Sequence, residues 1–351
     1  MATASAFQRG ESLIRPADGP PSRLASGFND VSASAPATLP HVFPLPAKLI
    51  RRTLLVTQLQ DYRYTDGVNF ITTHLRLFPP SVRGMQRLLK QDLRAAPLPY
   101  SETESLDKFG NRILEIRQER VKQHLSLAVV FRVETTCACD AQGDITPIGM
   151  PDTGALFDNG GYLATTHLTE PDGALQAVLA EFLTIHAVDP QRDALEFAAY
   201  LCTFLYIRMT YTSGSTSVST TAAEAWASRK GVCQDYAHVF LALARLAGLP
   251  ARYVSGFLPG EGAMHAWVEV LVNTVSGEGA YWYALDPTHN CWVSGRYVSV
   301  AVGRDYRDIV PNSGTYHGRA SNVLRHRSRV QIENTETQPY QANSGLLAGI
   351  A

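Results

Sequence analysis

The alternation of apolar and polar residues predicts strands in the first part of the chain. From Arg52 onward the pattern is typical of strands, and at 125–133 apolar residues alternate with less apolar ones, which is the period of a strand with one buried face. The predicted strands are Leu54–Tyr64, Val68–Phe78, Asn111–Gln118 and His124–Glu134. Strands that follow one another without helical crossovers favour a small antiparallel β-sandwich.

Apolar residues at helical spacing predict helices in the second half. The predicted helices are Pro171–Leu183, Arg192–Met209, Ala222–Trp226 and Asp235–Leu246. Gly248 and Pro250 follow the last helix and predict its end. Two strands with strict alternation, Met264–Val272 and Ala280–Asp286, come next around a Gly-rich turn. Helices followed by an antiparallel sheet indicate an α+β domain.

These patterns and the changes in composition predict the domain boundaries. The first 48 residues are rich in Ala, Ser and Pro and lack a sustained period, so we expect them to be mostly disordered. The remaining predicted parts are a β-sandwich domain at 49–140, connecting loops at 141–170, an α+β domain at 171–333 and a mobile tail at 334–351. The sequence also allows a short strand at 330–332 that returns to a sheet.

The composition limits which kinds of partner and which cellular compartment we expect. Lys and Arg number 31 against 32 Asp and Glu, so no excess of positive charge suggests nucleic acid or an anionic membrane as a partner. The N-terminus has no continuous apolar core of a signal peptide, and no later run approaches the ~20 apolar residues of a membrane span. Five scattered cysteines, an odd number, do not suggest a disulfide framework. We therefore expect a cytoplasmic protein.

Cys233 is the candidate nucleophile. It lies at the start of the predicted helix 235–246, where unpaired backbone N–H groups and the positive end of the helix dipole favour a thiolate. The same N–H groups could stabilise an oxyanion on a bound carbonyl. Taken alone, the position is weak evidence, because buried free cysteines are usually small packing residues.

The hairpin downstream supplies a candidate base and a residue to orient it. If the turn is symmetric and pairs Val272 with Gly279, then His265 lies directly opposite Asp286 on one face of the sheet. A carboxylate in that position can bond an imidazole nitrogen and fix its tautomer. Cys233, His265 and Asp286 then form the nucleophile, base and orienting acid of a thiol acyl-transfer site.

Four motifs carry a resemblance to a known family. They are GVCQDYAH at 231–238, GLPARYVSG at 248–256, HAWVEV at 265–270 and DPT at 286–288. In order and spacing they resemble the bacterial branch of the transglutaminase-like superfamily, which groups papain-like cysteine proteases and transglutaminases. The resemblance implies a papain/transglutaminase-like catalytic domain behind an N-terminal β domain, with Cys233 as nucleophile, His265 as general base and acid, and Asp286 as orienter. Tyr236 and His289 depart from the residues common in the family.

For the other candidate residues, ordinary packing or surface exposure explains the sequence at least as well as a role in the site. Gln234, Trp267 and Tyr211 are possible cleft-lining residues. His238 lies five residues after Cys233, about 140° around a helix, and should point away from the thiol. His289 and Cys291 follow the turn after Asp286, and we interpret them as ordinary surface. Cys137 and Cys139 lack the spacing and further ligands of a zinc site, so we expect no metal and no cofactor.

The function predicted from the sequence is thiol-dependent acyl transfer on a peptide or protein amide. Cys233 attacks the carbonyl, His265 protonates the departing amine, and a thioester is then resolved. Water as the acceptor makes the protein a cysteine protease or amidase, which we favour. A primary amine makes it a transglutaminase, and a non-catalytic protein-binding module is the alternative from another class. The sequence does not indicate an oligomeric state.

Overall fold

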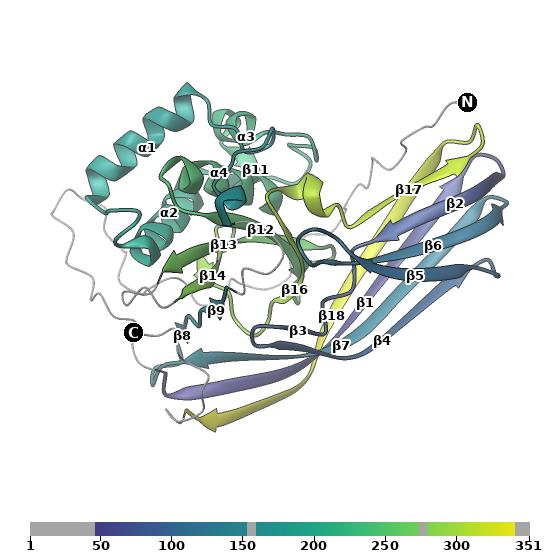
Figure 1. The fold of residues 1–351 in the computed structure, drawn as a ribbon, viewed down its shortest axis with the longest axis horizontal. Helices are drawn as coiled ribbons and strands as arrows, with labels where there is room; N and C mark the ends of the chain where they lie inside the picture. The colour runs from purple at the N-terminus through teal and green to yellow at the C-terminus, as the bar shows by residue number, and fades with distance from the viewer. Residues whose placement is uncertain (1–45, 153–158, 274–278, 341–351) are drawn as a thin grey trace.

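A computed structural model describes residues 46–152, 159–273 and 279–340 of the chain (Figure 1). The predicted disorder of residues 1–48 therefore falls almost entirely outside the described residues. Figure 1 shows two parts side by side, an elongated β-sandwich and a rounder part that contains the helices. The α+β fold class predicted from the sequence is confirmed. The described residues form mainly antiparallel sheets, and the helices follow one another in a separate part of the chain.

The sandwich consists of two antiparallel sheets. The larger sheet has the order β18-β1-β7-β4-β3 and is formed by β18 (Asn322–Pro339), β1 (Lys48–Tyr64), β7 (His124–Cys139), β4 (Gln86–Ala96) and β3 (Val82–Arg83), with β8 (Ile145–Thr146) paired to β7. The smaller sheet has the order β17-β2-β6-β5 and is formed by β17 (Asn312–His317), β2 (Val68–Leu75), β6 (Arg112–Val121) and β5 (Ser101–Leu106).

The sandwich includes strands from both ends of the described chain, which corrects the predicted boundaries. β17 and β18 follow the α+β part in sequence, yet both return to the sandwich, and β18 pairs with β1 from Asn322 to Pro339. The α+β part therefore ends before β17 and not at 333, and residues 334–339 of the predicted tail belong to a strand. Most of β18 is exposed and polar, so its sequence lacks the strong alternation of a half-buried strand.

The α+β part packs helices against one antiparallel sheet. The helices are α1 (Gly173–His186), α2 (Ala194–Arg208), α3 (Ala222–Ser228) and α4 (Cys233–Leu246), with short 3₁₀ helices η1 (Asn159–Tyr162) and η2 (Tyr306–Ile309). The sheet has the order β15-β14-β13-β12-β16 and is formed by β15 (Cys291–Trp292), β14 (Ala280–Asp286), β13 (His265–Asn273), β12 (Ala251–Phe257) and β16 (Val298–Gly303), with β9 (Met150–Pro151) paired to β14. A separate parallel pair joins β10 (Thr210–Tyr211) to β11 (Lys230–Gly231).

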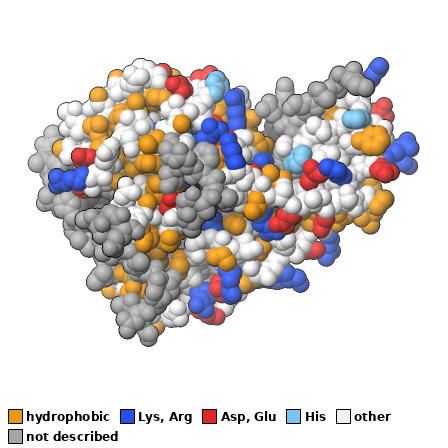
Figure 2. Space-filling view, in the orientation of Figure 1, with side chains coloured by type: hydrophobic (Ala, Val, Ile, Leu, Met, Phe, Trp, Pro, Cys, Tyr) orange, Lys and Arg blue, Asp and Glu red, His pale blue; other side chains and the backbone are white. Residues whose placement is uncertain are grey.

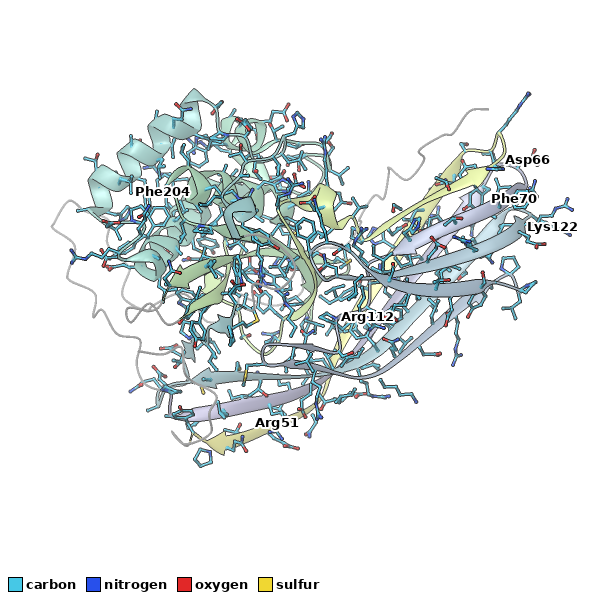
Figure 3. The ribbon with its side chains drawn as sticks, in the orientation of Figure 1. Arg51, Asp66, Phe70, Arg112, Lys122 and Phe204 are labelled. Carbon is cyan, nitrogen blue, oxygen red and sulfur yellow. The ribbon has the colours of Figure 1, made fainter. Side chains whose placement is uncertain are left out.

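Helix α4 is the centre of this part. It contacts β12 and β13 on one side and the other helices on the other, and residues 234–245 are all buried. Phe204 on α2 lies on the helical side of the molecule, while Phe70 and Lys122 mark the far end of the sandwich (Figure 3). On the face seen in Figure 2, acidic and basic side chains are intermixed over the sandwich. Within the described ranges, no helix is long and apolar enough to cross a membrane.

Gly256 is a position where the sheet tolerates no side chain. It pairs with His265 on β13 and lies at an irregularity in the pairing of β12 with β16. A Cβ there would lie 2.0 Å from the carbonyl oxygen of Val298 and 2.5 Å from the ring of Trp267. The first contact is with backbone, so a methyl group cannot be accommodated by a side-chain rotation.

We expect Gly256→Ala to lower the free energy of unfolding by about 3 kcal/mol or more, because the strand must shift to accept the methyl group. Urea unfolding of the purified variant measures the loss. Gly173→Ala is the matched control, since a Cβ at that position would have nothing within 4 Å and the residue begins helix α1. Equal stability of Gly256→Ala and the natural protein would contradict the tight packing of β12.

Candidate active site

Cys233 is the first residue of α4, and a local network sets the start of that helix. The preceding residue, Val232, has an extended backbone and caps the helix without a side-chain hydrogen bond. Instead, the Asp235 carboxylate accepts from the backbone N–H of Val232 at 2.7 Å and from the hydroxyl of Thr216 at 2.6 Å. Gly231 leaves room for this carboxylate, because a Cβ there would lie 2.5 Å from that of Asp235. Cys233 stays partly exposed, while residues 234–245 of the helix are buried.

His265 and Asp286 meet across the hairpin, although in a different register from the predicted one. Val272 pairs with Tyr281 and not with Gly279, so the strands are shifted by two residues and His265 is not directly opposite Asp286. A shift of two keeps each side chain on its original face. The side chains therefore still converge, and His265 Nε2 lies 2.7 Å from Asp286 Oδ2. Both residues are buried, at 3% and 0% exposure.

The Asp286 carboxylate is held by five donors. Oδ2 accepts from His265 Nε2 at 2.7 Å, from His289 Nδ1 at 2.7 Å and from the Tyr297 hydroxyl at 2.8 Å. Oδ1 accepts from the backbone N–H groups of Thr288 and His289 at 2.8 and 3.3 Å. Burial alone would raise the pKa of Asp286, but the charge of His265 and the hydrogen bonds from both histidines hold that pKa far below its ordinary value. The group is therefore a carboxylate at neutral pH.

His265 links this carboxylate to the thiol. Burial alone would lower the pKa of its imidazole, but the negative charges of Asp286 and Cys233 and hydrogen bonds to both hold that pKa well above the ordinary value. Since Nε2 is bonded to Asp286, Nδ1 is the nitrogen left for the sulfur of Cys233. The raised pKa favours an imidazolium ring at neutral pH.

The three possible cleft-lining residues take different positions. Tyr211 is 46% exposed, and its strand β10 pairs beside Gly231. Partial burial, followed by the charges of Cys233 and Glu261, raises the pKa of the Tyr211 hydroxyl, and Tyr211 pairs with Gly231, two residues before Cys233. Gln234 is buried and donates its side-chain amide to the carbonyl of Val218 at 3.3 Å. Trp267 is fully buried and stacks on His265, with ring centroids 6.2 Å apart.

His289 and Tyr297 are the two residues of this network that sequence reasoning missed. His289 was expected to be ordinary surface, but its ring lies 5.0 Å from that of His265, and it bonds Asp286. The signal available in the sequence was its place three residues after Asp286, directly after one of the resembling motifs. Tyr297 comes from a separate segment, and no motif marked it. Cys291, also expected at the surface, is buried and lies 3.4 Å from the Tyr297 hydroxyl.

The remaining candidates lie in the core. His238 is fully buried, accepts a hydrogen bond from the backbone of Tyr306, and has its pKa lowered to about 3 by burial, so its ring is neutral. Cys137 and Cys139 are buried on β7. Ligand atoms of His265, Asp286 and His289 lie within 4.8 Å of one another. These atoms already bond one another, so the arrangement is that of a hydrogen-bond network.

Comparisons with known proteins identify the family to which the chain is similar. A model of the transglutaminase-like superfamily matches residues 183–287, and a model of the bacterial transglutaminase-like N-terminal region matches residues 54–134. Uncharacterized proteins of Mycobacterium tuberculosis (strain ATCC 25618 / H37Rv) and Mycobacterium bovis are each 30% identical over 301 residues, covering 77% of this chain and 89% of each relative.

A solved structure has a similar fold. It is described as a "Putative Cysteine Protease from Cytophaga hutchinsonii", and it superposes with a TM-score of 0.63 at 21% identity. The match covers 83% of this chain and 94% of the other, so it spans both the sandwich and the helical part. At this identity the likeness is one of fold.

Proposed function

The chain belongs to the transglutaminase-like superfamily, and we propose that it catalyses thiol-dependent acyl transfer on peptide or related amide bonds, with water as the usual acceptor. The observation that carries the proposal is that the buried His265 is hydrogen-bonded to Asp286, while the charges of Asp286 and Cys233 both raise the pKa of its imidazole. A nucleophile, a base and a group that orients the base are the components of acyl-transfer catalysis. The burial of His265 and Asp286 supports this role, since their interaction is little screened by water.

In the proposed reaction, the Cys233 thiolate attacks the carbonyl carbon of the substrate amide. The resulting oxyanion lies near the start of α4, where backbone N–H groups without helical partners can donate to it. The C–N bond then breaks, and the His265 imidazolium gives its proton to the departing amine, which leaves an acyl thioester on Cys233.

The second half resolves the thioester. His265, now neutral, takes a proton from water as the water attacks the thioester carbonyl, and the sulfur leaves as a thiolate. Asp286 keeps the ring oriented in both halves through its bond to Nε2. A primary amine in place of water gives a new amide, which is the transglutaminase outcome.

We expect the intact protein to gain the mass of an acyl group on Cys233 when it is mixed with a library of glutamine-containing peptides. Running the reaction in ¹⁸O-labelled water, with and without a primary amine such as methylamine, separates the two acceptors. Labelled acid as the main product supports hydrolysis, and a methylamide as the main product supports the transglutaminase alternative. Absence of any adduct, together with a Cys233 thiol no more reactive than free cysteine at about pH 6, would favour a binding module.

A further inference from the structure

Tyr297 lies in the connection between two strands, and its side chain reaches the active site. It sits between β15 and β16, is 3% exposed, and donates its hydroxyl to Asp286 Oδ2 at 2.8 Å. Burial, followed by the charge of Asp286, raises the pKa of Tyr297 well above its ordinary value, so the hydroxyl stays protonated and can donate. Its ring packs edge-on against Trp267, with centroids 5.3 Å apart. The oxygen that receives this bond is the one that also binds His265.

The β-sandwich holds this segment on both sides of Tyr297. Two residues before it, the carbonyl of Gly295 accepts from the Thr135 hydroxyl at 2.6 Å. Two residues after it, Ser299 exchanges two bonds with the Gln86 side chain, from Ser299 N–H to Oε1 and from Nε2 to the Ser299 carbonyl, both at 2.8 Å. Gln86 and Thr135 are register partners on β4 and β7. One cross-strand pair of the sandwich therefore fixes both flanks of the tyrosine.

Packing alone does not fix this contact. A pocket of about 100 Å³ lies between the sandwich and the segment, and its lining includes Gln86, Thr135, Gly295, Tyr297 and Ser299. Because a pocket remains in this interface, directional hydrogen bonds help to set the place of the segment. The strand β16 is also the edge of its sheet, so its outward backbone groups are available to the sandwich.

From these contacts we infer that Tyr297 is a positioning residue for Asp286 and that the sandwich, through Gln86 and Thr135, sets the position of the Tyr297 hydroxyl. The inference rests on the proposed function and assigns the N-terminal domain a part in it. Sharing one carboxylate oxygen between His265 and Tyr297 limits how strongly the carboxylate holds the imidazolium proton. The sandwich therefore tunes how readily His265 gives that proton to the departing amine.

We expect Tyr297→Phe to lower kcat about 10-fold with KM nearly unchanged, because the loss falls on proton transfer and not on substrate binding. The pKa of the His265 imidazolium should rise, since Asp286 then has one donor fewer and binds the ring more strongly. Both the pH profile of Cys233 alkylation by iodoacetamide and an NMR titration of His265 report this shift. The other titratable groups around the pair are Cys233 on α4, Cys202 on α2, and His289 and Cys291 beyond β14.

A matched pair of variants tests whether the sandwich sets the position of Tyr297. Gln86→Met removes both bonds at Ser299, while Asn111→Leu removes a similar pair of bonds, of 2.8 and 2.7 Å, at Val302 farther along β16. Both variants should lose stability, but only Gln86→Met should raise the imidazolium pKa and lower kcat, about 3-fold. An unchanged His265 titration in Tyr297→Phe overturns the role of the hydroxyl. No shift in Gln86→Met, or an equal shift in both sandwich variants, overturns the role of the sandwich.

Different results would contradict the proposed function and the positioning role of Tyr297. If the natural protein forms no acyl adduct, the proposed function fails, yet the NMR titration of His265 in Tyr297→Phe still tests the positioning network. If the natural protein is active and Tyr297→Phe shows the same kcat and the same titration, the inference fails while the proposed function stands.

Discussion

Replacing Cys233 with alanine is expected to lower kcat for amide cleavage by about 10⁴-fold or more, because the thioester can no longer form. The fold should persist. Alanine is a good helix former and Cys233 is partly exposed at the first residue of α4, so the substitution leaves no buried cavity. Steady-state kinetics with the best peptide from the adduct experiment measures the loss, and a thermal melt within a few degrees of the natural protein confirms the fold.

The control is a buried cysteine elsewhere in the chain. Cys139 on β7 is 2% exposed, so Cys139→Ala should lower the melting temperature while leaving kcat unchanged. Activity that survives in Cys233→Ala, or that disappears equally in Cys139→Ala, would remove Cys233 as the nucleophile. A Cys233→Ala protein that is inactive but melts far below the natural protein would leave only the adduct mass as evidence, which is why both measurements are made on the same sample.

Asp286→Asn should combine a large loss of activity with a loss of stability. We expect kcat to fall about 10³- to 10⁴-fold, because an amide can present its N–H to the ring and favour the wrong tautomer. The buried imidazolium also loses its counter-charge, which should lower the free energy of unfolding by about 3 kcal/mol at its maximum. Kinetics and urea unfolding on the same preparation give both numbers.

The pH dependence of that stability loss follows from the two shifted pKa values. The pKa of Asp286 is lowered in the folded protein, so its contribution is present above about pH 4, the unfolded value, and is lost as pH falls below it. The pKa of His265 is raised, so its contribution is full below about pH 6.5 and is lost as pH rises through the folded value. The difference in stability between the natural protein and the Asp286→Asn variant should therefore be largest between about pH 4 and 6.5.

An exposed pair of the same residue types provides the control. Asp61 and His124 lie 3.1 Å apart on the sandwich, with side chains 48% and 55% exposed. Asp61→Asn should change stability by less than about 1 kcal/mol at any pH, since solvent screens such pairs. A stability loss in Asp286→Asn that is the same at pH 5 and at pH 9 would show that the buried pair is not ionised as described.

The sequence was most informative where an element has a regular hydrophobic period. Residues 234–245 of the helix that begins at Cys233 are buried, and the helical period and the end signals could be recognised. The strands that carry His265 and Asp286 alternate strictly, so their shared face could be predicted. Their register could not, because it depends on the geometry of the connection, and the predicted register was wrong by two residues.

Exposed strands and long-range contacts were the parts that sequence could not reveal. All six residues of β5 are exposed, so the segment shows no alternation of apolar and polar residues, although it pairs with β6 along its length. β18 is polar for the same reason, and its partner β1 is about 270 positions away in the chain, which no local pattern encodes. Tyr297 reaches Asp286 from beyond β15, and only the packed sheet brings the two together.

The pairing of β1 with β18 affects how the protein can be made. The first long strand of the sandwich has an unpaired edge until the ribosome has synthesised the chain beyond Pro339. During that interval β1 and β7 can form a sheet whose open edge is exposed to other chains, which is a risk for aggregation. The α4 helix and its sheet are synthesised earlier, but the segment that carries Tyr297 is braced by the sandwich, which stays incomplete until β18 has been synthesised. Enzyme activity is therefore expected to appear only after β18 has been synthesised and has paired with β1.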